Sequence, residues 1–160
     1  MRLFYFILTI HIITGIICLV TGLLAGFSKK KKGRHTLSGQ IYFWSYAFVF
    51  LSAVIMAIIH WEKSAYLFYI ALFSFSFALL GYLSVKRKKR NWLSQHIAGM
   101  LGSYIGIITA TLVVNSPRIS LLNEVPVLTI WLLPTVIGTP LIIRIGSKCV
   151  PKQKRQQVNC

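Results

Sequence analysis

Acidic side chains are nearly missing from this sequence. Its 160 residues include two glutamates, Glu62 and Glu124, beside 18 lysines and arginines. Neither glutamate lies inside an apolar stretch, so no carboxylate can stand beside a histidine within a membrane. A hydrolase or transferase that depends on such a pair is therefore disfavoured, and no nucleophile motif is visible.

Charge of either sign is also scarce, at 12% of the residues, whereas a soluble domain usually carries about 25%. The cations lie in short blocks between apolar stretches and provide no basic face of a folded domain. This arrangement disfavours nucleic-acid binding. Anionic lipid headgroups are the expected partner of the cations.

Cysteine occurs three times but never in a CxxC or CxxCH pattern, so neither a zinc knuckle nor covalent haem attachment of the c type is indicated. Cys18 lies inside the first apolar stretch, and Cys149 and Cys160 lie in the C-terminal tail. We therefore expect no disulfides.

Long apolar stretches dominate the chain, which is 56% hydrophobic. A stretch of ~20 apolar residues crosses the ~30 Å core of a bilayer as a helix. The sequence predicts an all-α integral membrane bundle, a single domain over residues 1–146 with a basic tail over residues 147–160. The five predicted spans are residues 3–27, 41–60, 66–85, 95–114 and 126–143.

The basic residues predict the orientation of these spans. Fifteen of the 18 lie in the loops at residues 28–40 and 86–92 and at the C-terminal end. Because lysine and arginine favour the cytoplasmic side, we expect the N-terminus outside and the C-terminus inside. Both glutamates then fall in short external loops.

Small residues form a stripe along the first and the fourth span, and each stripe includes a histidine. In a membrane, small residues allow helices to approach closely. The histidines on the stripes, His11 and His96, are therefore expected to face other helices. The residues predicted to pack against neighbouring helices are Gly15, Gly22, Gly26, Gly99, Gly102 and Gly106.

The fifth span contains three prolines. Pro126 suits a helix start, whereas Pro134, with Gly138 and Pro140 close behind it, predicts a kink or a break. Broken helices can line sites in transporters.

Two histidines are predicted at the same depth, each behind a basic block at the start of an even-numbered span. Two helices that present histidines in this way can hold a haem b between them. The predicted ligands are His35 and His96, with neighbouring cations for the propionates and Met100 as an alternative ligand. A histidine at the membrane surface is also commonly a solvated cap, so this alternative stays open, and no particular metal is indicated.

His11 is predicted to lie ~12 Å inside the membrane from its outer end. A polar group at that depth is costly and is functional by default, so His11 is a third candidate ligand. Its possible partner at the outer side is His60, whose depth matches less well.

A redox or ligand-binding membrane protein is the leading interpretation. The alternatives are a carrier for a small molecule or protons and a structural subunit of a homo- or hetero-oligomeric membrane complex. A proton relay has little to use, because the spans hold no acidic residue in their cores. It would run through His11, Tyr104, Thr14 and Thr109.

The motifs His11…Gly15…Gly22, Lys32-Gly33-Arg34-His35-Thr-Leu-Ser-Gly39…Tyr42 and His96…Met100…Ser103-Tyr104…Thr109-Ala110 resemble a bacterial family of small multi-pass membrane proteins of unknown function. The resemblance covers most of residues 5–140. It implies an integral helical bundle in a bacterial cytoplasmic (inner) membrane, with no established activity. It singles out His11, His35, Gly39, His96 and Tyr104.

A block of cations followed by a histidine occurs twice in the chain. This hints at similarity between the first and second pairs of spans, but two short matches do not establish a repeat.

Overall fold

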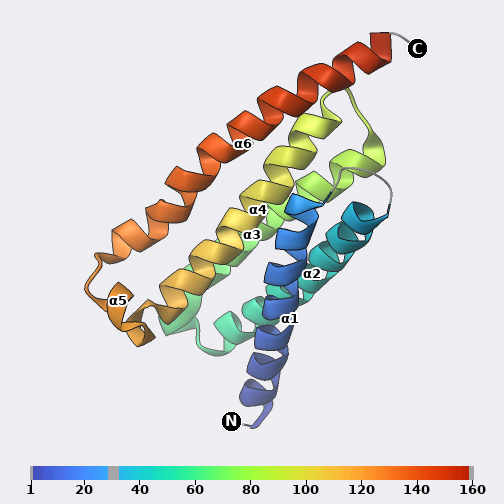
Figure 1. Cartoon of the computed structure of the whole chain (residues 1–160). Coiled ribbons are helices and arrows are strands. Elements are labelled where there is room, and N and C mark those ends of the chain that lie inside the picture. Colours follow the sequence, from blue (N-terminus) through green and yellow to red (C-terminus); the bar gives the residue numbers. More distant parts are fainter. Residues whose placement is uncertain (1, 29–32, 159–160) are drawn as a thin grey trace. The chain divides into compact units, whose positions relative to one another are not determined.

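The structure, a computed structural model, describes residues 2–28 and 33–158 (Figure 1). These residues form helices and no strand, and five of the helices are long and apolar enough to cross a membrane. The predicted all-α fold with five spans is therefore confirmed. The elements are α1 (Arg2–Phe27), α2 (Arg34–Ile59), α3 (Trp61–Arg87), α4 (Trp92–Asn115), the 3-10 turn η1 (Ser116–Arg118), α5 (Ser120–Asn123) and α6 (Val127–Val158).

The helices extend beyond the predicted apolar spans. Helix α2 begins at Arg34 instead of residue 41, and α3 follows α2 after a single residue, His60. The prediction that Glu62 lies in a loop is wrong, because it lies in the first turn of α3, where a negative charge favours the helix dipole. The predicted cation block at residues 29–32 lies outside the described residues.

Helix α6 is continuous through Pro134 and Pro140, so of the predicted kink or break, the break does not occur. A proline removes one backbone hydrogen bond, and in a membrane helix the neighbouring turns can hold the helix together. The helix follows Pro126, whose carbonyl accepts the N–H of Thr129 at 2.8 Å. It continues to Val158 and so includes most of the predicted tail.

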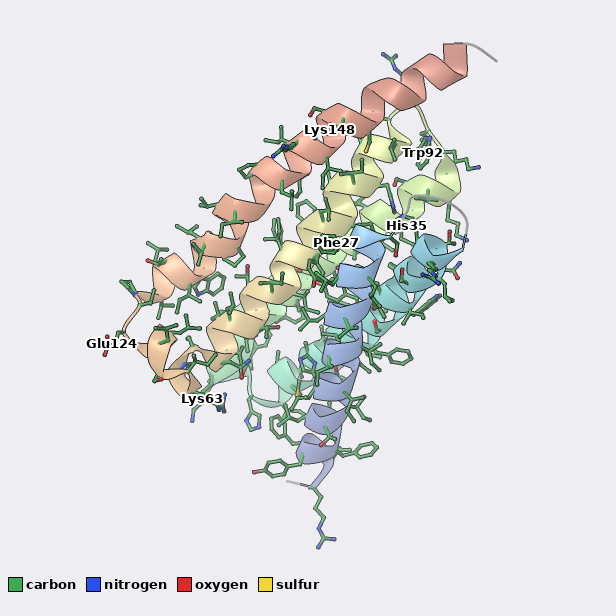
Figure 2. All side chains as sticks on the ribbon, viewed as in Figure 1. Phe27, His35, Lys63, Trp92, Glu124 and Lys148 are labelled. Carbon is green, nitrogen blue, oxygen red and sulfur yellow. The ribbon has the colours of Figure 1, made fainter. Side chains whose placement is uncertain are left out.

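The chain forms two compact units, Met1–Phe75 and Ser76–Cys160, and α3 contributes one half to each. In the first unit α1 packs along α2 (Figure 1). Cys18 of α1 and Tyr42 and Tyr46 of α2 are fully or almost fully buried there. Phe27 ends α1 and His35 lies at the start of α2, and both are at the same end of this unit (Figure 2).

In the second unit α4 packs against both α6 and the second half of α3. A Cβ atom built on Gly99 of α4 would lie 2.6 Å from Cα of Gly81 in α3, and one on Gly102 would lie 3.1 Å from the ring of Phe77. Gly138 of α6 likewise faces Ile105. Glycine thus lets these helix backbones approach closely.

Charge is separated along the second unit. Trp92, which follows the basic loop, lies at the same end as Lys148, and Glu124 lies at the opposite end (Figure 2). This unit therefore has one strongly basic end.

Candidate functional site

The histidines near the starts of α2 and α4 make the same kind of contact in the two units. Nδ1 of His35 lies 2.9 Å from the carbonyl oxygen of Ala25 in α1. Nδ1 of His96 lies 3.0 Å from the carbonyl oxygen of Gly81 in α3. A carbonyl oxygen only accepts hydrogen bonds, so Nδ1 carries the hydrogen in both rings. In the neutral form of each ring, Nε2 therefore bears the lone pair that a metal ion needs.

In both units the contact joins the start of one helix to the end of the helix before it. The first turns of α2 lie beside the last turns of α1, and the first turns of α4 lie beside the last turns of α3. In the second unit Gly99 packs on Gly81 within one turn of His96, and a Cβ on Gly81 would lie 2.8 Å from the backbone nitrogen of Met100. The glycine pair thus holds α4 close enough for the ring to reach the carbonyl.

The two residues whose carbonyls accept the histidine hydrogen bonds each lie at the end of a similar four-residue sequence. GLLA ends at Ala25 and ALLG ends at Gly81, and a serine follows three residues later in both cases, Ser28 and Ser84. The histidine follows its acceptor by 10 residues in the first unit and by 15 in the second. The two hairpins thus share a short common pattern but differ by five residues in the spacing from the acceptor to the histidine.

The similarity continues beyond the histidines. Three positions at the same distances after each histidine are buried, which places them on the face that the histidine shares. Together with the common hydrogen bond, this supports an internal repeat of the hairpin. The buried positions are Ser38, Tyr42 and Tyr46 after His35, and Gly99, Ser103 and Ile107 after His96.

His11 lies in the first unit and has a side-chain partner. Its Nδ1 lies 2.9 Å from Oγ of Ser52 in α2. That hydroxyl is also 2.8 Å from the carbonyl oxygen of Phe48. A hydroxyl has one hydrogen, and when it goes to the helix carbonyl, Oγ accepts the N–H of His11. This bond satisfies a polar group at a depth where it would otherwise be costly.

The remaining candidate residues make local contacts. His60 follows α2, is exposed, and its ring packs edge-on against Phe4 with 4.8 Å between ring centroids. The hydroxyls of Thr14 and Thr109 donate to carbonyls of their own helices at 2.8 and 2.9 Å. Met100, the alternative ligand, packs against Gly81.

Buried polar contacts in the first unit were not expected from the sequence. The hydroxyl of Tyr46 in α2 hydrogen-bonds that of Ser74 in α3, and both residues are buried. Sγ of Cys18 lies 3.7 Å from the carbonyl oxygen of Tyr42. Ser74 and Cys18 both lie seven residues before the histidine-binding carbonyls, which is the signal that could have revealed them.

A comparison with protein families identifies the chain. The family described as "Predicted membrane protein (DUF2306)" matches residues 8–139. The chain belongs to this family. The matched region of this DUF2306 protein contains all four histidines, and the resemblance to a family of membrane proteins of unknown function is confirmed. No curated protein and no solved structure matches it.

The side chains of this DUF2306 protein that could bind a metal ion determine which kind of metal site can be considered. Among the described residues, no group of three or more histidine, cysteine or acidic side chains could hold a metal ion. His35 and His96 are therefore considered as single ligands and not as members of a larger cluster. A haem iron needs at most two such ligands from the protein, because the porphyrin supplies the other four.

Proposed function

We propose that this DUF2306 protein binds a b-type haem through Nε2 of His35 and of His96, as a redox-type membrane protein. The observation that supports the proposal is the Nδ1 hydrogen bond of each histidine to a backbone carbonyl. Histidines that ligate metals commonly donate their other N–H in this way, which fixes the tautomer and orients the ring.

Two further properties suit haem. The apolar spans provide the surroundings that a porphyrin ring needs, and the cations beside the histidines can bind its propionates. Arg34 directly precedes His35 in the chain and begins α2. When bound, the haem would supply one-electron chemistry, and the chain would orient it and set its potential through the axial ligands.

We also propose that the protein lies in the bacterial cytoplasmic membrane, with its basic loops and C-terminal end on the cytoplasmic side. The separation of Lys148 and Trp92 from Glu124 in the second unit supports this orientation (Figure 2). The positive-inside rule and the anionic headgroups of that leaflet favour it.

An absorption spectrum of the detergent-purified protein, oxidised and then reduced with dithionite, tests the haem proposal. We expect a Soret band and sharp α and β bands after reduction. His35→Ala and His96→Ala should each abolish this bis-histidine spectrum. His60→Ala is the matched control and should retain it, because the His60 side chain is exposed and its ring packs edge-on against Phe4.

A protein that stays colourless after haem is supplied would contradict the proposal. The carrier and the structural subunit would then be the functions to test. A carrier should need His11 and Thr14, whereas a structural subunit should copurify with a partner and tolerate changes at the histidines.

A further inference from the structure

A pocket of about 410 Å³ opens in the second unit, between the last turns of α3 and the first turns of α4. One wall is apolar and includes Phe77, Leu80 and Leu83, and the basic end of the pocket carries Arg87 and Lys89. Its volume lies in the range of small-molecule sites, roughly 300–1,000 Å³. The pocket thus joins an apolar surface to two cations.

Among the described residues of this unit, no acidic side chain lies at the end that carries those cations. Glu124 is the single acidic residue in the sequence of this unit, and it lies at the end opposite Trp92 and the basic loop (Figure 2). Both Arg87 and Lys89 are exposed. The pocket therefore has an unbalanced positive charge and favours an anion.

The dimensions of the pocket indicate which anion. From Phe77 to Arg87 the wall runs along α3 for ~15 Å, at ~1.5 Å per residue. This equals half of the ~30 Å hydrocarbon core of a bilayer, or one leaflet. A small soluble anion would use the cations alone, whereas a lipid uses the cations and the apolar wall together.

We propose that this pocket binds one anionic glycerophospholipid from the leaflet at the basic end of the unit. Arg87 and Lys89 bind the phosphate of the headgroup, and Arg is well suited to phosphate because it can donate two parallel hydrogen bonds. One acyl chain lies along Phe77, Leu80 and Leu83. Leu80 is 62% exposed, which leaves apolar surface for the chain to cover. The site does not depend on the proposed haem.

The test compares phosphatidylglycerol with phosphatidylcholine, by native mass spectrometry of lipid adducts after controlled delipidation. We expect one retained phosphatidylglycerol per chain. The double variant R87A/K89A should bind it on the order of tenfold more weakly, since two charge-assisted contacts are lost. The matched control K86A/R90A removes the same charge from the same segment at two residues that do not line the pocket, and should bind as the unchanged protein does.

A second variant tests the apolar wall. Ala98 lines the pocket and is exposed, so Ala98→Phe fills the space for the acyl chain without changing the charge. It should also weaken phosphatidylglycerol binding, with helicity by circular dichroism and elution volume unchanged.

Three results would overturn the proposal. Equal weakening in both double variants would show a general attraction of charges. Loss in R87A/K89A with none in Ala98→Phe would show a headgroup contact outside the pocket. Competition by inorganic phosphate at the same concentration as the lipid would show a site for soluble anions.

Discussion

Gly81 and Gly99 bring α3 and α4 into backbone contact, because a Cβ atom on Gly99 would lie 2.6 Å from both the nitrogen and the Cα of Gly81. The carbonyl of Gly81 also accepts the hydrogen bond of His96. This backbone contact between α3 and α4 and the histidine site of the second unit therefore share one residue.

Gly99→Ala should destabilise the protein by roughly 1–3 kcal/mol, because the backbone of α3 cannot move away as a flexible side chain could. Unfolding in mixed micelles with increasing SDS measures the change. Gly15→Ala is the matched control. Apart from its chain neighbours and the backbone of its own helix, no atom of the described chain lies within 4 Å of the added Cβ, so alanine there should be neutral or stabilising by up to about 1 kcal/mol. Equal losses at both positions would contradict this interpretation.

His96 has two roles to separate: Nδ1–H donates a hydrogen bond to Gly81, and Nε2 is the proposed haem ligand. The side-chain N–H of asparagine can replace Nδ1–H, but asparagine has no atom that corresponds to Nε2. His96→Asn should stay within about 0.5 kcal/mol of the unchanged protein, and His96→Ala should cost about 1 kcal/mol. Both should lack the haem spectrum. A coloured His96→Asn protein would show that His96 is not the ligand.

His11 and Ser52 should be energetically coupled. In membrane proteins such hydrogen bonds average about 0.6 kcal/mol and reach about 1.7 kcal/mol in double-mutant cycles. A cycle of His11→Ala and Ser52→Ala, measured by SDS unfolding, should give a coupling in this range. Pairing His11→Ala with Thr21→Val should give none, because the Thr21 hydroxyl donates to its own helix at 2.7 Å. Coupling of zero in the first cycle would contradict the contact.

Tyr46→Phe should destabilise the first unit by about 1–2 kcal/mol, because it removes the buried hydrogen bond to Ser74 and leaves the rest of the ring in place. Tyr69→Phe is the comparison, since Tyr69 is 61% exposed and its change should cost less than about 0.5 kcal/mol. The same unfolding measurement checks both, and equal effects would argue against the bond.

The sequence predicted the spans well, because apolar length is what the bilayer demands of a helix. It missed the true start of α2, because hydropathy cannot detect helical turns that extend beyond the membrane core. The cation blocks only hint at the similarity of the two hairpins, because the spacing from the accepting carbonyl to the histidine differs by five residues between them. The packing role of Gly81 could not be predicted, because Gly81 belongs to no GxxxG motif and its contact depends on Gly99 of another helix. The pocket could not be predicted either, since it exists only once α3 and α4 pack together.

The partners of His35 and His96 are main-chain oxygens, and every residue type carries one. Substitution at position 25 or 81 therefore cannot delete the acceptor, and can only shift it or crowd the ring that it holds. A relative with another small residue at either position would keep the same ring orientation. Among relatives, the side chains at positions 25 and 81 should thus all be small, whether or not they can form hydrogen bonds.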